Sequence, residues 1–196
     1  RILFSDNYYS ALDRDNVALV TEPISTVTPD GISTIDGQHH RADVLIYATG
    51  FKASEFLAPI AVTGKNNRKL RDEWQQGAEA YLGISVRNFP NLFMLYGPNT
   101  NLGHNSIVIM IESQMRYILS CLKQMQKQQL KSVEIKSSVQ QVFNKKIQQR
   151  LKSKTWSSID ESWYIADGKI VNNWPGTTVE YWWRTHKCDL DKYSCN

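Results

Sequence analysis

The chain has 196 residues and a mass of 22.5 kDa, with 41% hydrophobic residues, 21% charged residues and a formal net charge of +4 at pH 7. This composition excludes an intrinsically disordered chain, a collagen and a disulfide-rich scaffold. The longest apolar runs, such as 107–111, have about five residues, whereas a membrane-spanning helix needs about twenty. We therefore expect a globular protein with no transmembrane segment.

Cysteine use and targeting signals point to the cytoplasm. The three cysteines, Cys121, Cys188 and Cys195, are scattered and odd in number, which favours a reducing compartment. The sequence contains neither a signal-peptide pattern nor an N-x-Ser/Thr site. We predict a cytoplasmic protein. Because the chain begins with Arg1 rather than Met, we also expect a fragment of a longer protein.

The first fifty residues are predicted to be mainly β. Short β-branched runs separated by turn residues predict the strands of a small β-meander, at 16–21, 24–28 and 31–34. Asp36-Gly37 is a strong signal for a two-residue hairpin turn. The segment 42–50 follows, and its continuous apolar run Val44–Ala48 is typical of a strand that a parallel sheet buries on both faces.

Residues 51–97 are predicted to be irregular up to a second buried strand. Within the irregular part, 70–76 is a possible short helix. The apolar run Pro90–Gly97 predicts the strand, which again ends at a glycine. A polar loop at 98–105 then leads into a long helix capped by Asn105 or Ser106.

The second half of the chain is predicted to be helical. In the long helix, apolar residues three and four positions apart predict one inward-facing stripe, made of Val108, Ile111, Met115, Ile118, Leu122 and Met125. Residues 133–135 form a possible short strand. A second amphipathic helix is expected from about Ser138, with an inward face made of Val139, Val142, Phe143, Ile147 and Leu151. The whole pattern favours an α/β fold completed by residues outside the chain.

Several residue patterns suggest binding sites but have ordinary explanations. Ten basic residues lie between positions 114 and 154 against the single acid Glu134. They could bind an anionic surface, but we interpret them as the solvated faces of two helices and predict no nucleic-acid partner. His39-His40 has no partner ligands at metal-binding spacing, so we predict no metal site.

The two turns that follow the predicted buried strands are the best candidates for a site. They are 48–51 and 96–100, and glycine in each lets the backbone approach a ligand closely. The second turn carries several polar side chains and leads to a helix N-terminus, which favours an anion. The alternative interpretation of both is an ordinary glycine turn.

Several segments, in order, resemble the flavin-containing and Baeyer–Villiger monooxygenases. Asp43–Phe51 is similar to the superfamily segment D-x-(I/V)-I-x-A-T-G-(F/Y). Its F-P-N-L-F, G-P, N and I-E pattern is matched by Phe89–Phe93, Gly97–Asn99, Asn105 and Ile111-Glu112. Further matches resemble the Baeyer–Villiger subgroup, above all its hydroxyacetophenone and steroid monooxygenase types, at Arg1, Tyr8-Tyr9, Arg14–Val17, Ser162–Tyr164 and Trp174–Gly176.

The resemblance covers the whole chain but only the carboxyl third of such an enzyme. It implies a disulfide-reductase-like flavoprotein with two Rossmann-type domains, in which 1–50 ends the NADP-binding domain and 51–196 is the C-terminal segment of the FAD-binding domain. It implies that FAD and NADPH are used to insert one oxygen atom of dioxygen into a ketone through a flavin peroxide, giving an ester or lactone. The ten glycines never stand two apart, so both G-x-G-x-x-G segments would lie in the missing N-terminal part. We expect the fragment alone to be inactive.

The resemblance also implies the roles of individual residues. Arg1 would be the catalytic cation, since arginine stays protonated and stabilises developing negative charge. Trp163 would reach the nicotinamide nucleotide, and Thr49, Gly50 and Phe51 would lie where the two nucleotide domains meet. The stretch beside the flavin ring and the adjoining helix N-terminus would comprise Gly97, Pro98, Asn99, Thr100, Asn101, Leu102 and Asn105.

Two other functions stay open at this point. One is a flavin monooxygenase that oxygenates nitrogen or sulfur, which protonates its flavin peroxide and needs no arginine. The other is a non-enzymatic binding module that uses the lysine-rich helices and binds polyanions in a salt-dependent way.

Overall fold

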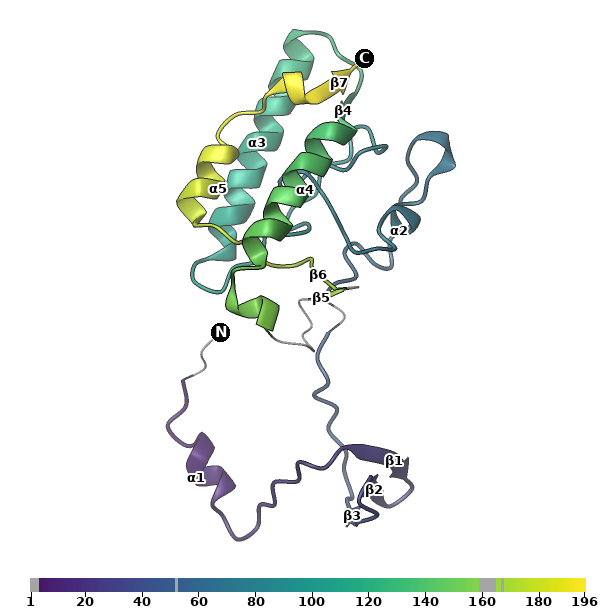
Figure 1. Ribbon diagram of the computed structural model, residues 1–196, viewed down its shortest axis with the longest axis vertical. Coiled ribbons are helices and arrows are strands. Elements are labelled where there is room, and N and C mark those ends of the chain that lie inside the picture. The colour runs from purple at the N-terminus through teal and green to yellow at the C-terminus, as the bar shows by residue number, and fades with distance from the viewer. Residues whose placement is uncertain (1–3, 52, 159–164, 167) are drawn as a thin grey trace. The chain divides into compact units, whose positions relative to one another are not determined.

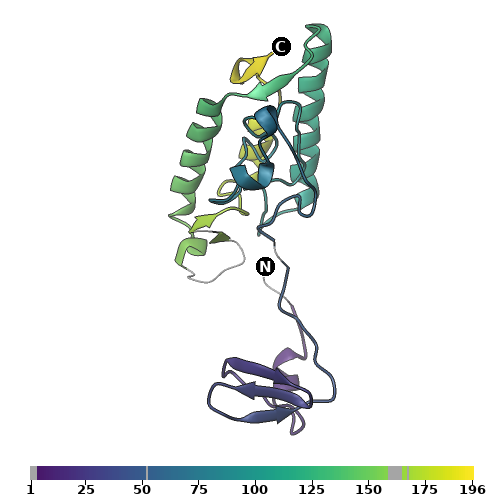
Figure 2. The ribbon, with the colours of Figure 1, turned by 90° about the vertical axis from the view of Figure 1, so that its right-hand side faces the viewer.

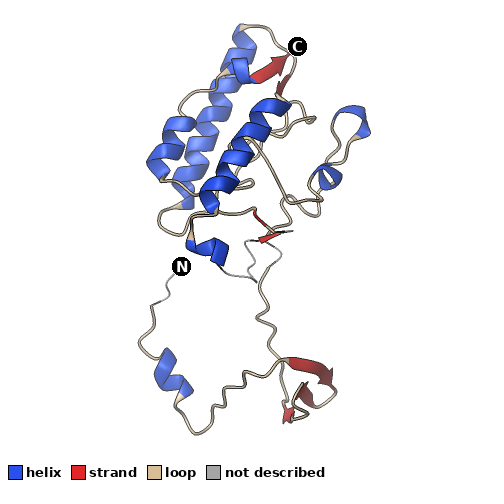
Figure 3. Cartoon of the chain, viewed as in Figure 1, coloured by secondary structure: helices blue, strands red, loops and turns tan. Residues whose placement is uncertain are grey.

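The computed structural model describes residues 4–51, 53–158, 165–166 and 168–196. The chain divides into two compact units, Arg1–Phe51 and Lys52–Asn196 (Figure 1). Figure 3 shows that the first unit carries the longest strands, whereas helices and irregular loops make up most of the second.

The first unit is a three-stranded antiparallel meander preceded by a short helix, α1 (Tyr8–Leu12). Its strands are β1 (Ile24–Thr28), β2 (Gly31–Thr34) and β3 (His39–Arg41), paired in the order β1-β2-β3. The predicted hairpin turn is confirmed at this place, with Gly37 at a φ of 83°, but its loop is longer than the predicted two residues. The amide of Thr34 donates to the carbonyl of Gln38, and that of Gly37 donates to the carbonyl of Thr34, so that the loop comprises 35–37. The meander is therefore present, but 39–41 supplies its third strand.

Two predicted strands of this unit are wrong. Residues 16–21 and 42–50 form no ladder with any described residue. In the second segment the side chains of Val44, Ile46 and Tyr47 are exposed, with Ile46 at 88%. A strand forms only where another strand can accept its hydrogen bonds. A hairpin brings that partner within a few residues, but a buried parallel strand needs a partner from a distant segment.

The second unit is built on two long helices, α3 (Ile107–Lys127) and α4 (Ser137–Leu151). In Figure 2 they flank the irregular segments drawn in blue, and one hydrophobic core includes side chains from all three. The shorter helical elements are η1 (Lys65–Asn67), α2 (Leu70–Glu73), η2 (Thr155–Ser158), α5 (Thr178–Arg184) and η3 (Leu190–Lys192). The strands are β4 (Val133–Ile135), β5 (Ile165–Ala166), β6 (Lys169–Ile170) and β7 (Tyr193–Cys195).

All sheets among the described residues are antiparallel, with β4 paired to β7 and β5 paired to β6. The predicted strand 90–97 is wrong, because it lies in no sheet of the described chain. Its backbone bonds to loops instead: the amide of Met94 donates to Ile84 and that of Asn91 to Val133. The predicted strand 133–135 and the short helix near 70 are confirmed.

The buried face of α3 differs from the predicted apolar stripe. Val108, Met115 and Leu122 are exposed, and the helix buries another face, made of Met110, Ser113, Gln114, Tyr117 and Cys121. Hydrogen bonds explain how polar groups can lie there: the side chain of Gln114 accepts from the amide of Tyr96 and donates to the hydroxyl of Tyr181. The predicted inward face of α4 is mostly confirmed, but Val142 is exposed.

No helix of the described ranges is both long and apolar enough to cross a lipid bilayer.

Candidate functional site

The loop predicted to lie beside the flavin forms one wall of a cavity of about 340 Å³ in the second unit. Gly97, Asn101 and Asn172 contribute to this wall. Apolar side chains, among them Phe56, Leu57, Met94 and Leu95, form much of the remainder, and Tyr96 also lines the cavity. The cavity therefore combines an apolar surface with amide and hydroxyl groups, as small-molecule sites usually do.

Gly97 lies where two loops touch. A Cβ on Gly97 would overlap the carbonyl oxygen of Gly83, and a Cβ on Gly83 would overlap the side chain of Thr100. The glycine at the bend is thus required by the contact between two loops of the chain itself, which agrees with the alternative interpretation of an ordinary glycine turn. The close approach to a ligand expected from the sequence stays a prediction. Because Gly97 lines the cavity, this contact holds one part of the cavity wall in place.

Three predicted site residues direct their side chains into the protein. Leu102 is buried in the core, and the hydroxyl of Thr100 donates to the carbonyl of Gly97. The side-chain amide of Asn99 donates to the carbonyls of Ile170 and Asn173. These side chains hold the loop in shape and do not line the cavity. Pro98 is buried as well.

The N-terminus of α3 follows this loop, and Ser106 caps it. Its side-chain oxygen accepts a hydrogen bond from the amide of Val108, which confirms one of the two predicted caps. Asn105 accepts from the amide of Ser106 and donates to the hydroxyl of Thr178 on α5. The structure therefore ties the start of α3 to the start of α5.

The remaining predicted site residues lie elsewhere. Thr49, Gly50 and Phe51 end the first unit, where Gly50 has a φ of 82° with open space around its α-carbon and Phe51 is exposed. Arg1 and Trp163 lie outside the described residues. The structure assigns no contact to either.

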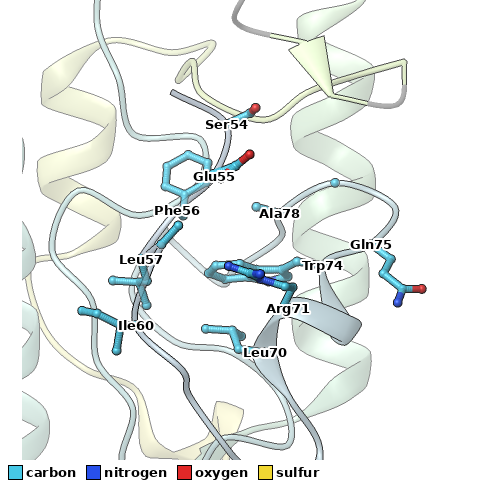
Figure 4. Close-up of a pocket in the computed structure, with 12 residues that line it drawn as sticks. Ser54, Glu55, Phe56, Leu57, Ile60, Leu70, Arg71, Trp74, Gln75 and Ala78 are labelled. Carbon is cyan, nitrogen blue, oxygen red and sulfur yellow. The ribbon is translucent and has the colours of Figure 1, made fainter. Parts of the chain in front are cut away.

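A second cavity, of about 360 Å³, adjoins α2 (Figure 4). Leu57, Ile60, Leu70 and Trp74 give it an apolar lining, with Arg71 among the polar lining groups. Phe56 and Leu57 line both this cavity and the one beside Gly97. The two cavities therefore share part of their lining.

Sequence reasoning assigned no role to three polar residues of the first cavity and its support. These are Tyr96, which lies in the predicted turn 96–100, and Asn172 and Asn173. The match at Trp174–Gly176 adjoins these residues, but the pairing of 172–174 with the loop at 99–101 was not predicted. This pairing joins segments more than seventy positions apart, through a parallel bridge between Asn101 and Asn173. The repeated asparagines were the available signal, because buried amides need partners.

Part of the basic strip is neutralised within the second unit. Arg150 on α4 makes a two-pronged contact with Glu180 on α5, with nitrogen–oxygen distances of 2.6 and 2.7 Å, and Arg184 reaches the same carboxylate. The hydrogen bonds from Arg150 lower the pKa of Glu180. This pairing favours the structural interpretation of these basic residues. Among the described residues, no group of three or more His, Cys, Asp or Glu could hold a metal ion.

Glu180→Gln is expected to lower the unfolding free energy at pH 7 by about 1 kcal/mol, because the ion pairs that it removes are partly exposed. Since the pKa of Glu180 is lower in the folded state, its stabilisation is present above the unfolded pKa near 4.5 and is lost as the pH falls through the folded value. Urea unfolding at pH 7 and pH 3 tests this. The difference between the two proteins should shrink at pH 3, and an equal difference at both would contradict the assignment.

Comparisons with known proteins place the chain beside flavin-dependent monooxygenases, although no protein-family model matches it. A Baeyer–Villiger monooxygenase of Pseudomonas aeruginosa is 42% identical over 196 residues, which cover 98% of the chain and 37% of that enzyme. An FAD-binding monooxygenase, ktnD, of Aspergillus niger is 42% identical over 187 residues, 92% of the chain and 31% of that protein. The crystal structure of OTEMO in complex with FAD and NADP has a TM-score of 0.87 and 28% identity, covering all of the chain and 38% of that structure. The chain thus spans about a third of the length of these relatives.

Proposed function

By homology the chain belongs with the Baeyer–Villiger monooxygenases, over about 37% of the length of its Pseudomonas relative, and we propose that it forms part of such an enzyme. That enzyme would use FAD and NADPH to insert one oxygen atom of dioxygen into a ketone, giving an ester or a lactone. Bound FAD would supply the activation of dioxygen. The observation that carries the proposal is the match of 98% of the chain to a Baeyer–Villiger monooxygenase and of 92% to an FAD-binding monooxygenase.

The described residues fit one wall of a flavin site. From the Gly97–Leu102 loop, Gly97 and Asn101 line the cavity, beside the apolar surface of Phe56 and Leu57. A flat heterocycle with polar edges suits such a mixed surface. The chain has no G-x-G, however, so a phosphate cradle of the usual kind must come from other residues. Gly97–Leu102 and Asn105 would therefore hold the ring side of FAD.

Exposed apolar surfaces support a larger protein. The outer face of α3 exposes Val108, Met115 and Leu122, and in the first unit Val44 and Ile46 are exposed. Exposed apolar groups in such numbers mark surfaces that another protein segment covers. We propose that the remainder of the enzyme covers both surfaces.

The unit boundary supports a division into two nucleotide-binding domains. Residues 1–50 would end the NADP-binding domain, and residues 51–196 would be the C-terminal segment of the FAD-binding domain, close to the boundary between Phe51 and Lys52. Thr49, Gly50 and Phe51 would then lie at the domain junction. Trp163 would contact the nicotinamide nucleotide. A cytoplasmic location agrees with the three free cysteines.

Arg1 would act on charge at the reacting atoms. A guanidinium group stays protonated at any working pH and donates several hydrogen bonds, so it would stabilise the oxyanion that develops on the ketone oxygen. Oxygenation of nitrogen or sulfur creates no such oxyanion. Replacing Arg1 therefore distinguishes the two kinds of monooxygenase.

A chimeric enzyme tests the proposal. In it, residues 1–196 replace the matching segment of the Pseudomonas aeruginosa monooxygenase. The chimeric enzyme should bind FAD stoichiometrically and oxidise NADPH in the presence of a cyclic or aryl ketone, whereas the 196-residue chain alone should bind FAD weakly. Flavin absorbance after gel filtration and ketone-dependent ester formation are the measurements. Tight, stoichiometric FAD binding by the chain alone would contradict the proposed division of the site.

Arg1→Ala in the chimeric enzyme should keep the FAD content and lose ester formation by about a hundredfold, the size of effect seen for other oxyanion-stabilising groups. Unchanged turnover with Arg1→Ala on a thioether, without ester formation by the parent, would favour the heteroatom-oxygenating alternative. Salt-dependent binding of a polyanion by the 196-residue chain would favour the binding module.

A further inference from the structure

Two buried side chains, Gln114 on α3 and Tyr181 on α5, connect two loops of the second unit by hydrogen bonds. The backbone amide of Tyr96 donates to Oε1 of Gln114 at 2.8 Å, and Nε2 of Gln114 donates to the hydroxyl of Tyr181 at 3.0 Å. The hydroxyl of Tyr181 in turn donates to the backbone carbonyl of Leu82. Both side chains are 0% exposed, and we call this pair the Gln114–Tyr181 bridge.

The direction of each hydrogen bond in the bridge follows from its two backbone ends. A backbone amide can only donate and a backbone carbonyl can only accept. The side-chain oxygen of Gln114 must therefore face the amide of Tyr96, and its nitrogen is left to donate to Tyr181. The hydroxyl of Tyr181 gives its own proton to Leu82. Burial raises the pKa of Tyr181, so the hydroxyl keeps that proton.

Both ends of the bridge lie at residues with a left-handed backbone. Leu82 and Tyr96 each have a φ of 56°, which is unfavourable for a residue with a side chain. Such conformations persist only where the surrounding structure holds them, and they cluster at ligand sites. The bridge supplies a holding contact at each of the two residues, to the carbonyl of Leu82 and to the amide of Tyr96.

These two left-handed residues directly precede the two glycines that touch. Leu82 precedes Gly83 and Tyr96 precedes Gly97, and a Cβ on Gly97 would overlap the carbonyl oxygen of Gly83. The bridge therefore connects both turns to α3 and α5 next to the place where the turns meet. Gly97 lines the cavity of about 340 Å³, whereas neither residue of the bridge does. The bridge thus acts on the cavity wall without belonging to it.

Packing alone does not require polar groups at these two positions. Methionine and phenylalanine have nearly the shapes of glutamine and tyrosine, and they would fill the same space without any need for hydrogen-bond partners. A buried polar network whose members are paired selects one arrangement of the elements that it joins. In this protein the joined elements are the turns at Leu82-Gly83 and Tyr96-Gly97.

We propose that Gln114 and Tyr181 are positioning residues of the flavin site, because they hold the two touching turns in the arrangement that places Gly97 against the bound ring. This inference rests on the proposed function, in which the Gly97–Leu102 loop holds the ring side of FAD. Each residue acts through the backbone of the turn that it holds. Loss of the bridge therefore lowers the population of the binding-competent wall, and the affinity for FAD falls with it.

Amide hydrogen exchange in the 196-residue chain tests the bridge without a ligand. Gln114→Met removes both hydrogen bonds of the side chain, and it should speed exchange of the Tyr96 amide about tenfold relative to the amides of β4. Gln140→Met is the matched control, because Gln140 is a glutamine on α4, 2% exposed, whose oxygen accepts the amide of Arg87 at 2.7 Å. It should speed exchange at Arg87 and leave Tyr96 unchanged. Equal effects of the two variants on Tyr96, or no effect of Gln114→Met, would overturn the bridge.

FAD affinity in the chimeric enzyme tests the positioning role. Gln114→Met should weaken FAD binding about tenfold. Tyr181→Phe keeps the ring that packs against Trp174 and leaves Tyr96 its partner, so it should weaken binding only about threefold. The double variant should be no weaker than Gln114→Met alone, because both substitutions break one bridge. Gln140→Met should lower the urea midpoint as much as Gln114→Met does but leave FAD affinity unchanged. Flavin fluorescence titration gives the affinities.

Three results would contradict the positioning role. One is an unchanged FAD affinity in Gln114→Met, and another is an additive loss in the double variant. The third is a loss in Gln140→Met equal to that in Gln114→Met, which would show a general effect of lower stability.

Failure of the proposed function gives a different pattern. In that case the unsubstituted chimeric enzyme would bind no FAD, while exchange of the Tyr96 amide in the 196-residue chain would still respond to Gln114→Met. This pattern would contradict the proposed function and the flavin contact, and it would leave the Gln114–Tyr181 bridge as a structural feature of the two turns.

Discussion

Trp174→Ala is expected to lower the unfolding free energy of the chain by about 3–5 kcal/mol, the usual cost of truncating a buried tryptophan. Trp174 is 1% exposed, and its ring meets that of Tyr181 edge-on with centroids 5.1 Å apart. Its indole N–H donates to the carbonyl of Thr177. Truncation would leave a cavity next to Asn173 and would remove one of the two hydrogen bonds that the carbonyl of Thr177 accepts, the other coming from the amide of Tyr181. Chemical unfolding followed by circular dichroism measures the loss.

Trp183→Ala is the matched control because Trp183 belongs to the neighbouring helix α5 and is 68% exposed. It should change the unfolding free energy by no more than about 0.5 kcal/mol, as surface substitutions usually do. Equal losses for the two variants would contradict the burial assigned to Trp174. A loss below 1 kcal/mol for Trp174→Ala would contradict the core of the second unit as described.

Local signals predicted local structure well. The turn at Asp36-Gly37 was predictable because a hairpin loop needs a residue with a positive φ, which strongly favours glycine. The start of α3 was predictable because a serine side chain can accept the amide hydrogen two residues on, as Ser106 does from Val108. Each of these features depends on a few adjacent residues.

Signals that depend on distant partners failed. The apolar run at 44–48 has the composition of a buried strand, yet its side chains are largely exposed. Burial of such a run requires neighbouring strands, and the run itself does not encode whether they are present. The periodicity of α3 correctly indicated a helix, but the buried face carries Ser113 and Gln114. Partners far along the chain satisfy Gln114, and no periodicity in the helix encodes them.

The candidate site was predictable as a segment but not as a set of side chains. The pattern around Gly97 located the loop that lines the cavity. The inward direction of Asn99 and Thr100 depends on hydrogen bonds to the loop itself and to residues 170–173. Tyr96 was missed because a tyrosine before a glycine carries no sign of a left-handed backbone.

Gly97→Ala is expected to destabilise the chain by about 1–3 kcal/mol, the usual cost of forcing a methyl group into a packed site. The new methyl group would overlap the carbonyl group of Gly83. Because the overlapped atoms belong to the backbone, no side-chain rotation can relieve the overlap. The two loops must therefore separate, which displaces the cavity wall that carries Asn101 and Tyr96. In the chimeric enzyme, a shift of that wall by about 1 Å should reduce ester formation about a hundredfold.

Gly103→Ala is the control in the same loop, because no atom of the described residues, the two chain neighbours aside, lies within 4 Å of a Cβ built there. It should leave the unfolding free energy within about 0.5 kcal/mol of the parent. If Gly97→Ala retained the parent's stability and FAD affinity, the contact between the loops would not hold the wall. If it lost stability but kept ester formation, the reacting atoms would lie away from this wall. If Gly97→Ala lost both stability and ester formation while Gly103→Ala kept both, the contact between Gly97 and Gly83 would be tied to the ligand site. A displaced cavity wall connects these two losses.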